Sequence, residues 1–295
     1  MSQPFALACR GGLNVNLNQL EIMRQPGLAT ELLNFEVDPD GGYRRISGFT
    51  LFGGGSSARP NSSNKILGLA VYADGLIACS GTGIFFSQDG TSWLQINKAS
   101  VSGSGDNYST FTGRSNDART SQGQCSFALF EGTSDYGEML ICDGANKPFF
   151  FKMTGTGALA DRTFFAGEIT VDSTTAPTVG VIHENHFVVG GAPTAKNKIF
   201  FSSTLDPDSF SGSGAGSIQL TDAIVGLSSF RSDLIIFCKN SIFKLINISD
   251  SDNIAIVPIT QNVGCLDGNS IQEIGGDLLF LSPDGIRTVA GTARI

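Results

Sequence analysis

Residues 224–245 have the sequence IVGLSSFRSDLIIFCKNSIFKL, which contains the unit from which most of the chain is built. An apolar segment, Ile224–Leu227, is followed by a polar turn. A run of five apolar residues, Leu234–Cys238, comes next, and another apolar segment begins at Ile242. Short apolar runs bounded by turn residues are typical of buried β-strands. The stretch therefore predicts three consecutive strands joined by short turns.

The same pattern occurs five times along the chain. We expect its central runs to be buried inner strands, at Leu76–Cys79, Met139–Cys142, Phe187–Val189, Leu234–Phe237 and Leu278–Leu281. The widest gap between successive runs falls across a polar insertion at 97–124. A repeat of about 40 to 50 residues made of short strands is typical of propeller blades. The sequence thus predicts an all-β fold, a β-propeller-like array of about five blade repeats with an extended N-terminal hairpin segment.

Residues 1–60 lack the repeat and are expected to form a separate N-terminal segment, with the propeller-like domain at 61–295. A helix from Pro26 to Leu33, a strand at Phe35–Val37, a second strand at Tyr43–Phe52 and a Gly/Ser-rich linker from Gly53 to Asn64 are predicted in order. The insertion at 97–124 is expected on the surface, either as a functional loop or as a dispensable one.

Charge and composition exclude several classes of protein. Residues 1–60 hold five basic and five acidic residues, so the net charge of -8 comes from the remainder of the chain. The sequence has no basic stripe of the kind that binds nucleic acid without regard to its sequence. The sequence has no run of 18 apolar residues, so it predicts no membrane span. The first residues do not resemble a secretory signal.

The six cysteines are expected to be reduced thiols. Cys79, Cys142 and Cys238 close the central run in three different repeats, where a small buried apolar residue fits. Equivalent strands of separate sheets are also too far apart for a disulfide bond. Reduced cysteines are usual in a protein that folds in a cytosol.

Three short motifs suggest chemistry, and for each a structural role is the better prediction. Ser87–Trp93 resembles the Asp-box turn of sialidase-type propellers, with Ser202–Phe210 as its counterpart, but the arginine cluster and tyrosine nucleophile of a glycosidase are missing. His183 and His186 lie in a hairpin, where they do not easily share one metal. Asp250–Asn253 lacks the full ligand set of a calcium loop. The sequence therefore predicts no enzyme activity, no cofactor and no metal site.

The N-terminal segment carries a more specific signal. Gly12-Leu13-Asn14 is followed by the run from Leu33 to Phe49, LNFEVDPDGGYRRISGF. These residues resemble the N-terminal region of tailed-bacteriophage virion proteins of the tail-nozzle and head-tail stabilisation type. The resemblance is specific over positions 1–60 and extends to the remainder only by architecture. Nozzle proteins of that family are usually much longer than this chain.

The resemblance implies a structural component of a phage tail or neck, located in the virion and assembled in the host cytoplasm. It implies a homo-oligomeric ring that lines the DNA exit path without binding DNA specifically and contacts other tail or neck proteins (adaptor, portal, fibres). Leu28, Leu32, Phe35, Arg44, Arg45 and Phe49 are the candidate assembly interface. The alternative is a host-surface glycan-binding propeller, a receptor-binding tail component with the 97–124 insertion as its receptor loop.

Overall fold

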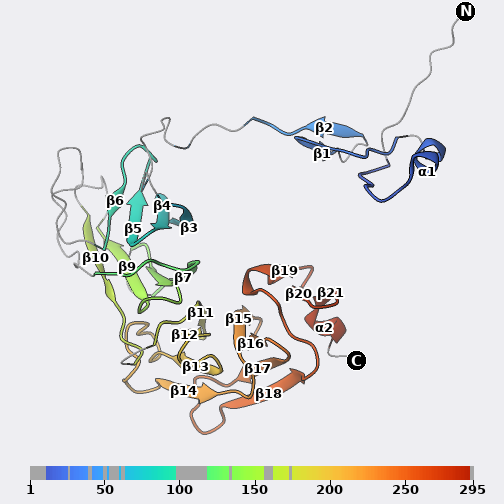
Figure 1. Ribbon diagram of the computed structural model, residues 1–295. Coiled ribbons are helices and arrows are strands. Elements are labelled where there is room, and N and C mark those ends of the chain that lie inside the picture. The colour runs from blue at the N-terminus through green and yellow to red at the C-terminus, as the bar shows by residue number, and fades with distance from the viewer. Residues whose placement is uncertain are drawn as a thin grey trace, which may run out of the picture. The chain divides into compact units, whose positions relative to one another are not determined.

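The computed structural model describes residues 11–25, 27–38, 42–48, 52, 60, 64–97, 118–132, 135–155, 162–172 and 175–292. The chain divides into two compact units, Met1–Leu51, the N-terminal unit, and Phe52–Ile295, the body (Figure 1). None of the helices in these described ranges has the length and apolar character needed to cross a membrane.

The helix of the N-terminal unit lies earlier than predicted. Helix α1 spans Gln19–Arg24, and Gly27 to Leu33 are not helical. Asn18 caps α1, its side chain accepting from the amide of Glu21 while the Glu21 carboxylate accepts from the Asn18 amide. This reciprocal capping box starts a helix at a defined residue. Ala29 instead pairs with Leu13 in a parallel bridge, so the predicted helix at Pro26–Leu33 is wrong.

The predicted hairpin is present but shorter than expected. Strand β1 (Phe35–Val37) pairs antiparallel with β2 (Tyr43–Arg45). Asn34 has a left-handed φ of 61°, which ends β1 on its N-terminal side. The Ile46 amide still donates to the Asn34 carbonyl at 3.0 Å, but the pairing ends there because Asn34 has left the extended conformation. The prediction of a strand extending to Phe52 is therefore wrong over Ile46–Gly48. The predicted linker from Gly53 lies largely outside the described residues.

In its described residues the body contains five successive antiparallel sheets, each a meander in chain order. The first sheet is β3 (Ile66–Tyr72), β4 (Gly75–Ser80), β5 (Gly83–Ser87) and β6 (Leu94–Gln95). The second is β7 (Ser126–Phe130), β8 (Glu138–Cys142), β9 (Phe149–Thr154) and β10 (Thr163–Glu168). The third is β11 (Val179–His183), β12 (His186–Gly190), β13 (Lys198–Phe201) and β14 (Gly216–Gln219). The fourth is β15 (Ile224–Phe230), β16 (Asp233–Cys238), β17 (Ile242–Ile246) and β18 (Ala255–Thr260). The fifth has three strands, β19 (Gln272–Ile274), β20 (Asp277–Ser282) and β21 (Gly285–Thr288), between the 3-10 turn η2 (Gly268–Ser270) and helix α2 (Val289–Thr292).

The sheets follow one another as propeller blades do, which confirms the predicted fold class. In Figure 1 they run from β3–β6 to β19–β21 with their first strands on the inner side of the body. Strand β11 contacts both β7 and β15, and η2 contacts β15. Between the first two sheets, the amide of Cys125, just before β7, donates to the Leu67 carbonyl of β3 at 2.9 Å. In the first four sheets the first strand thus lies beside that of the next, and in the fifth the turn before β19 lies beside β15.

The five predicted inner strands are the second strands of five separate sheets, one position outward from the innermost strands. The first four of these segments are largely buried as expected, whereas in the fifth Leu278 and Phe280 are buried and Leu281 is exposed. Side chains alternate between the two faces of a strand. In β8, Met139 and Ile141 pack into the core shared with the first sheet, whereas Leu140 and Cys142 pack into the core shared with the third. Both faces of such a strand are covered by neighbouring sheets, and this explains the continuous apolar runs in the sequence.

The insertion at 97–124 is only partly described. Residues 98–117 lie outside the described ranges, and residues 118–124 correct the prediction of a wholly surface segment. Arg119 and Gln122 are buried. The Arg119 guanidinium donates to Asp143 at 2.9 Å, and the Gln122 side chain donates to the Gly83 carbonyl at 3.0 Å. The C-terminal end of the insertion therefore joins the first sheet to the second.

Candidate functional site

The candidate assembly residues all belong to the N-terminal unit. Phe49 lies outside the described residues. Leu28 and Leu32 are half-buried, and Phe35 remains 49% exposed. Leu32 and Phe35 line an open hollow of about 440 Å³ together with Glu31, Leu33 and Tyr43. Leu32 and Phe35 are therefore the two candidates that lie together at one apolar surface.

The two arginines of the hairpin are in different situations. Arg44 faces Glu36 across the hairpin and forms an ion pair at 2.6 Å, with both side chains about half exposed. An exposed pair of this kind contributes about 0–1 kcal/mol, so Arg44 can exchange it for a partner's carboxylate at little cost. Arg45 is opposite Phe35 in the register and lines a second, smaller hollow with Asn34 and Ile46–Gly48.

Helix α1 adds apolar residues that the sequence analysis missed. Leu20 is 74% exposed and Met23 is 78% exposed. Residues three apart lie on one face of a helix, so these two side chains form a single apolar stripe. The sequence signal for them was the capping box of Asn18 and Glu21, which places the helix and hence the stripe. Leu13, Val15 and Leu33 of the same unit are also exposed.

The hairpin is fixed to the rest of its unit by one tyrosine. The Tyr43 hydroxyl donates to the Gly12 carbonyl at 2.8 Å and also lies 3.2 Å from the Gly27 carbonyl. Gly12 and Gly27 flank α1 in sequence. The apolar residues of α1 and of the hairpin therefore belong to one small folded unit.

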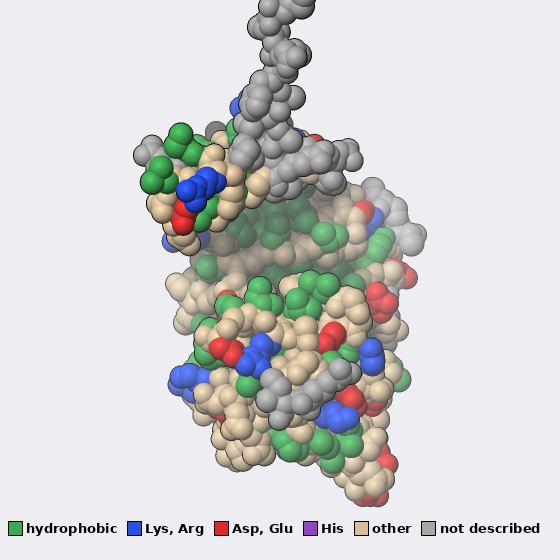
Figure 2. Space-filling model, turned by 90° about the vertical axis from the view of Figure 1, so that its right-hand side faces the viewer, with side chains coloured by type: hydrophobic (Ala, Val, Ile, Leu, Met, Phe, Trp, Pro, Cys, Tyr) green, Lys and Arg blue, Asp and Glu red, His purple; other side chains and the backbone are tan. Residues whose placement is uncertain are grey.

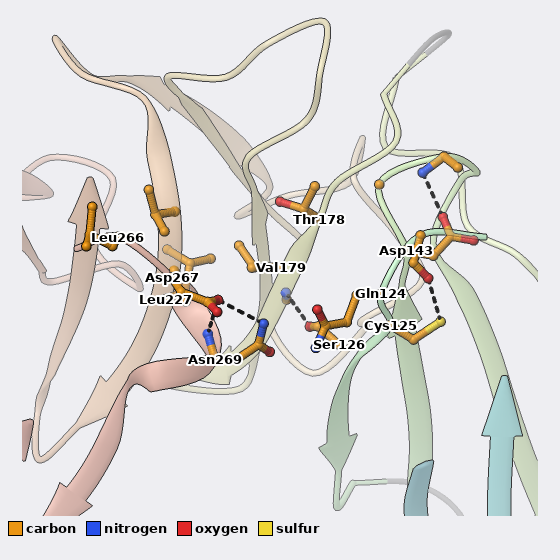
Figure 3. Close-up of a pocket in the computed structure, with 17 residues that line it drawn as sticks. Gln124, Cys125, Ser126, Asp143, Thr178, Val179, Leu227, Leu266, Asp267 and Asn269 are labelled. Atoms are coloured by element: carbon orange, nitrogen blue, oxygen red, sulfur yellow. Dashed lines mark hydrogen bonds between the residues drawn. The ribbon is translucent and has the colours of Figure 1, made fainter. Parts of the chain in front are cut away.

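The body has a cavity of about 490 Å³ where the inner ends of the sheets meet (Figure 3). Its lining comes from the start of β7, the end of β8, the start of β11, part of β15 and the turn before β19. A cavity at the ends of blade strands is a usual place for a ligand site in such folds. Whether this cavity is a ligand site depends on the polar groups around it.

Protein partners already engage the polar side chains of this cavity. The Asp143 carboxylate accepts from fully buried Arg119 and from the amides of Ala145 and Asn146. The Asp267 carboxylate accepts from the amide of Asn269 at 3.0 Å, which caps η2. These hydrogen bonds, shown dashed in part in Figure 3, hold the turns around the cavity in place.

Glycines in the repeat mark where first strands approach closely. A Cβ at Gly226 would lie 2.4 Å from Ile271 Cδ1 and 3.1 Å from Gly268 Cα. A Cβ at Gly68 of β3 would lie 2.7 Å from the Cβ of Cys125, just before β7. The sequence pattern contained these glycines, but their role becomes clear only when neighbouring strands are placed side by side.

The Asp-box-like turn has internal hydrogen bonds to its Asp side chain, as predicted. The Asp89 carboxylate accepts from the Thr91 hydroxyl at 2.6 Å and from the Thr91 amide at 2.8 Å, and these hydrogen bonds lower the pKa of Asp89. Gly90 supplies the left-handed φ of 76° that the turn needs, and its amide donates to the Ser87 hydroxyl. In the counterpart turn, Phe210 packs edge-on against Phe187.

The two histidines face each other across the β11–β12 hairpin but bond to different neighbours. His183 Nδ1 lies 2.9 Å from the Ser229 hydroxyl, and burial lowers the pKa of His183. His186 Nδ1 lies 2.6 Å from the Ser202 carbonyl. Within the described ranges, no three His, Cys, Asp or Glu side chains gather in a way that could hold a metal ion.

Comparisons with known proteins give distant structural matches alone. No family model matches the chain, and no curated protein matches it. AztD of Citrobacter koseri is 9% identical, with a TM-score of 0.44 over 73% of this chain, which spans about half (53%) of AztD. A candidate 6-phosphogluconolactonase of Bacteroides uniformis is 10% identical, with a TM-score of 0.47 over 86% of this chain and 72% of that one. YCF48, solved with a D1 peptide, is 9% identical, with a TM-score of 0.36 over 83% of this chain and 80% of that one.

Proposed function

We propose that this chain is a structural, non-catalytic component of a phage tail or neck, a nozzle-like subunit whose N-terminal unit docks on an adaptor or portal-like ring. The observation that carries the proposal is the apolar surface of the N-terminal unit. Leu20, Met23 and Phe35 are exposed on this small unit, whose sequence also resembles the N-terminal region of virion proteins. Exposed apolar residues in such density mark a protein interaction site.

The rim of this surface supplies charge as well as apolar area. Arg44 and Arg45 are both exposed at the end of the hairpin. Charged groups around an apolar centre orient a partner and raise the rate of encounter. We therefore expect the docking partner to present apolar pockets to Leu20, Met23 and Phe35 and carboxylates to the two arginines.

The negative net charge of the body suits a scaffold past which DNA moves without being bound. All of the net charge of -8 lies outside positions 1–60, and an acidic surface repels a phosphate backbone. The carboxylates of the central cavity are bonded within the protein. These features support a structural role in a homo-oligomeric ring and the location in the virion that goes with it.

The double variant L20Q/M23Q tests the docking surface. Glutamine is a good helix former, so α1 and the body should fold as in the wild type. Burying a Leu or Met side chain contributes about 1.5–3 kcal/mol, and losing two should reduce incorporation into virions by more than about tenfold. The measurement is quantitative mass spectrometry of purified virions from a host that supplies the variant in place of the wild-type chain.

Thr30→Gln, on the exposed surface of the same unit, is the matched control and should leave incorporation unchanged. Deleting residues 1–52 should leave a soluble, cooperatively folded β-body that no longer enters virions. Unchanged incorporation of L20Q/M23Q, or a truncated chain that fails to fold, would show that this unit is not the docking element. A monomeric protein that binds host-surface glycans would favour the receptor-binding alternative.

A further inference from the structure

Each sheet of the body has two faces that serve two different neighbours. We call the face toward the preceding sheet the back face and the face toward the following sheet the front face. In β16, Leu234 and Ile236 point from the back face into the core shared with the third sheet. Ile235 and Phe237 point from the front face into the core shared with the fifth. Every sheet contact described in the body therefore joins one front face to one back face.

The first sheet has a back face for which the described chain provides no covering sheet. In β4, Ile77 and Cys79 pack toward the second sheet. The opposite face carries Leu69 and Val71 of β3, paired in register with Ala78 and Leu76. Leu69 is 57% exposed and Val71 is 72% exposed. This is an apolar sheet face of the kind that is buried elsewhere in the body.

The fifth sheet has a front face of the same character, which no sheet among the described residues covers. Leu278 and Phe280 of β20 pack toward the fourth sheet. The alternate residue Leu281, with Ile286 opposite it on β21, and Ile274 of β19 lie on the other face and are exposed, Ile286 to 76%. Figure 2, seen from the side of the fifth sheet, shows hydrophobic side chains at the surface of the body.

These two faces are the two halves of one type of contact. Four front-to-back contacts hold the described sheets together, and among those sheets one front face and one back face are left over. We propose that the front face of the fifth sheet packs on the back face of the first sheet of a second copy of this chain. The contact continues the packing already used between sheets and places Ile274, Leu281 and Ile286 against Leu69 and Val71.

A contact between two different faces has a definite consequence for assembly. It is heterologous, so each copy that joins leaves a free front face at one end and a free back face at the other. Such contacts make a ring when the rotation closes and an open array when it does not. The proposal concerns the self-association of this chain and does not depend on which larger structure the chain joins.

Two single substitutions test the contact in the full-length protein. Val71→Glu places a charge on the back face, and Ile286→Glu places one on the front face. Both side chains are largely exposed, so each variant should retain the circular dichroism spectrum and thermal unfolding of the wild type. Sedimentation analysis over a range of concentrations should show species larger than a monomer for the wild type. Each variant alone should be monomeric, with association weakened at least about tenfold.

The mixture of the two variants is the decisive measurement. V71E keeps a good front face and I286E keeps a good back face, so an equimolar mixture should form a one-to-one dimer and nothing larger. Leu205→Glu, at an apolar residue of the β13–β14 loop that is 57% exposed, is the control and should associate as the wild type does. A wild-type monomer at all concentrations, a mixture that stays monomeric, or a loss of association in L205E would overturn the proposal.

Failure of this contact can be distinguished from failure of the virion proposal. If V71E and I286E keep the wild-type mass distribution, copies meet through another surface and the front-to-back contact is wrong. Virion incorporation of L20Q/M23Q reports on the N-terminal unit and is independent of that result.

Discussion

The carboxyl group of Glu138 is almost fully enclosed between the second sheet and the β13–β14 loop. Its Oε2 lies 3.2 Å from Lys152 Nζ, and Lys152 also lies 3.9 Å from Asp208 Oδ2. Glu138 Oε1 and Asp208 Oδ1 are buried and lack a hydrogen-bond partner in the described structure. When Glu138 is protonated, its carboxyl group can donate that proton to the Asp208 carboxylate, and the Lys152 ammonium balances the one remaining negative charge. Burial and the neighbouring Asp208 raise the pKa of Glu138 to about 8.

This proton predicts a pH-dependent stability. The pKa of Glu138 is about 8 in the folded protein against 4.5 for an unperturbed glutamate, so between these values the folded chain holds a proton that the unfolded chain has released. The contribution of Glu138 to the free energy of unfolding should fall as the pH rises from about 5 to about 8, by at least about 1.4 kcal/mol, the equivalent of one pKa unit. Buried His183, whose pKa is lowered, contributes with the opposite sign in this range, and this contribution is common to the wild type and to Glu138 variants. The measurement is the thermal midpoint at several pH values.

Glu138→Gln should remove the contribution of Glu138 because the amide is neutral at every pH and can donate to Asp208. The exposed residue Glu273 provides the matched control, Glu273→Gln, which should keep the wild-type slope. Parallel profiles for the wild type and E138Q would show that Glu138 is ionised in the folded protein throughout this range.

At the scale of elements, the central strands were predictable and the ends of elements were not. A strand such as β16 is recognisable because both of its faces are buried, so that five apolar residues follow one another. The start of α1 depends on side-chain hydrogen bonds of Asn18, and the end of β2 depends on the length of its partner strand. Such local partners outweigh the weak preference that placed a helix after Pro26. The exposed stripe of Leu20 and Met23 was missed for the same reason.

The close approach of first strands predicts the effect of Gly226→Ala. The added methyl group would lie 2.4 Å from Ile271 Cδ1, which must turn aside, and 3.1 Å from the Cα of Gly268, so β15 and the turn before β19 must also separate by a few tenths of an ångström. Overpacking of this kind costs about 1–3 kcal/mol, measurable as a lower midpoint in urea unfolding. Gly48→Ala, where nothing lies within 4 Å of the new Cβ, should have little effect. Equal effects of the two variants would mean that β15 and the turn can separate freely.

At the scale of the whole molecule, the repeat predicted the array of sheets, whereas contacts between sheets required the structure. The spacing of apolar runs is visible in the sequence, but which residue of the insertion returns to the core is not. Arg119, expected on a surface loop, forms a fully buried ion pair with Asp143. A charged residue in a polar stretch carries no sign of burial, because its partner is distant in the chain. The proposed assembly interface could be located from the sequence only as a segment.

The thiols provide a test that involves the whole fold. Cys79, Cys125, Cys142, Cys238 and Cys265 are free and buried, and Cys9 lies outside the described residues. Burial raises the pKa of Cys238 to about 12 and that of Cys142 further, so the native protein should react slowly with a thiol reagent. In denaturant without reductant we expect all six cysteines of the chain to titrate as thiols in a colorimetric assay. A count near zero would contradict folding in a reducing compartment.

The alternation of front and back faces also bears on how such a chain can change during evolution. Because a sheet of the body presents one face to each neighbour, duplicating the segment that encodes it adds a front face and a back face together. The new sheet would find a matching surface on both sides from the first generation onward. Gain or loss of an entire repeat is therefore a smaller disturbance to this architecture than the gain or loss of a single strand, which would expose a hydrogen-bonding edge inside the array.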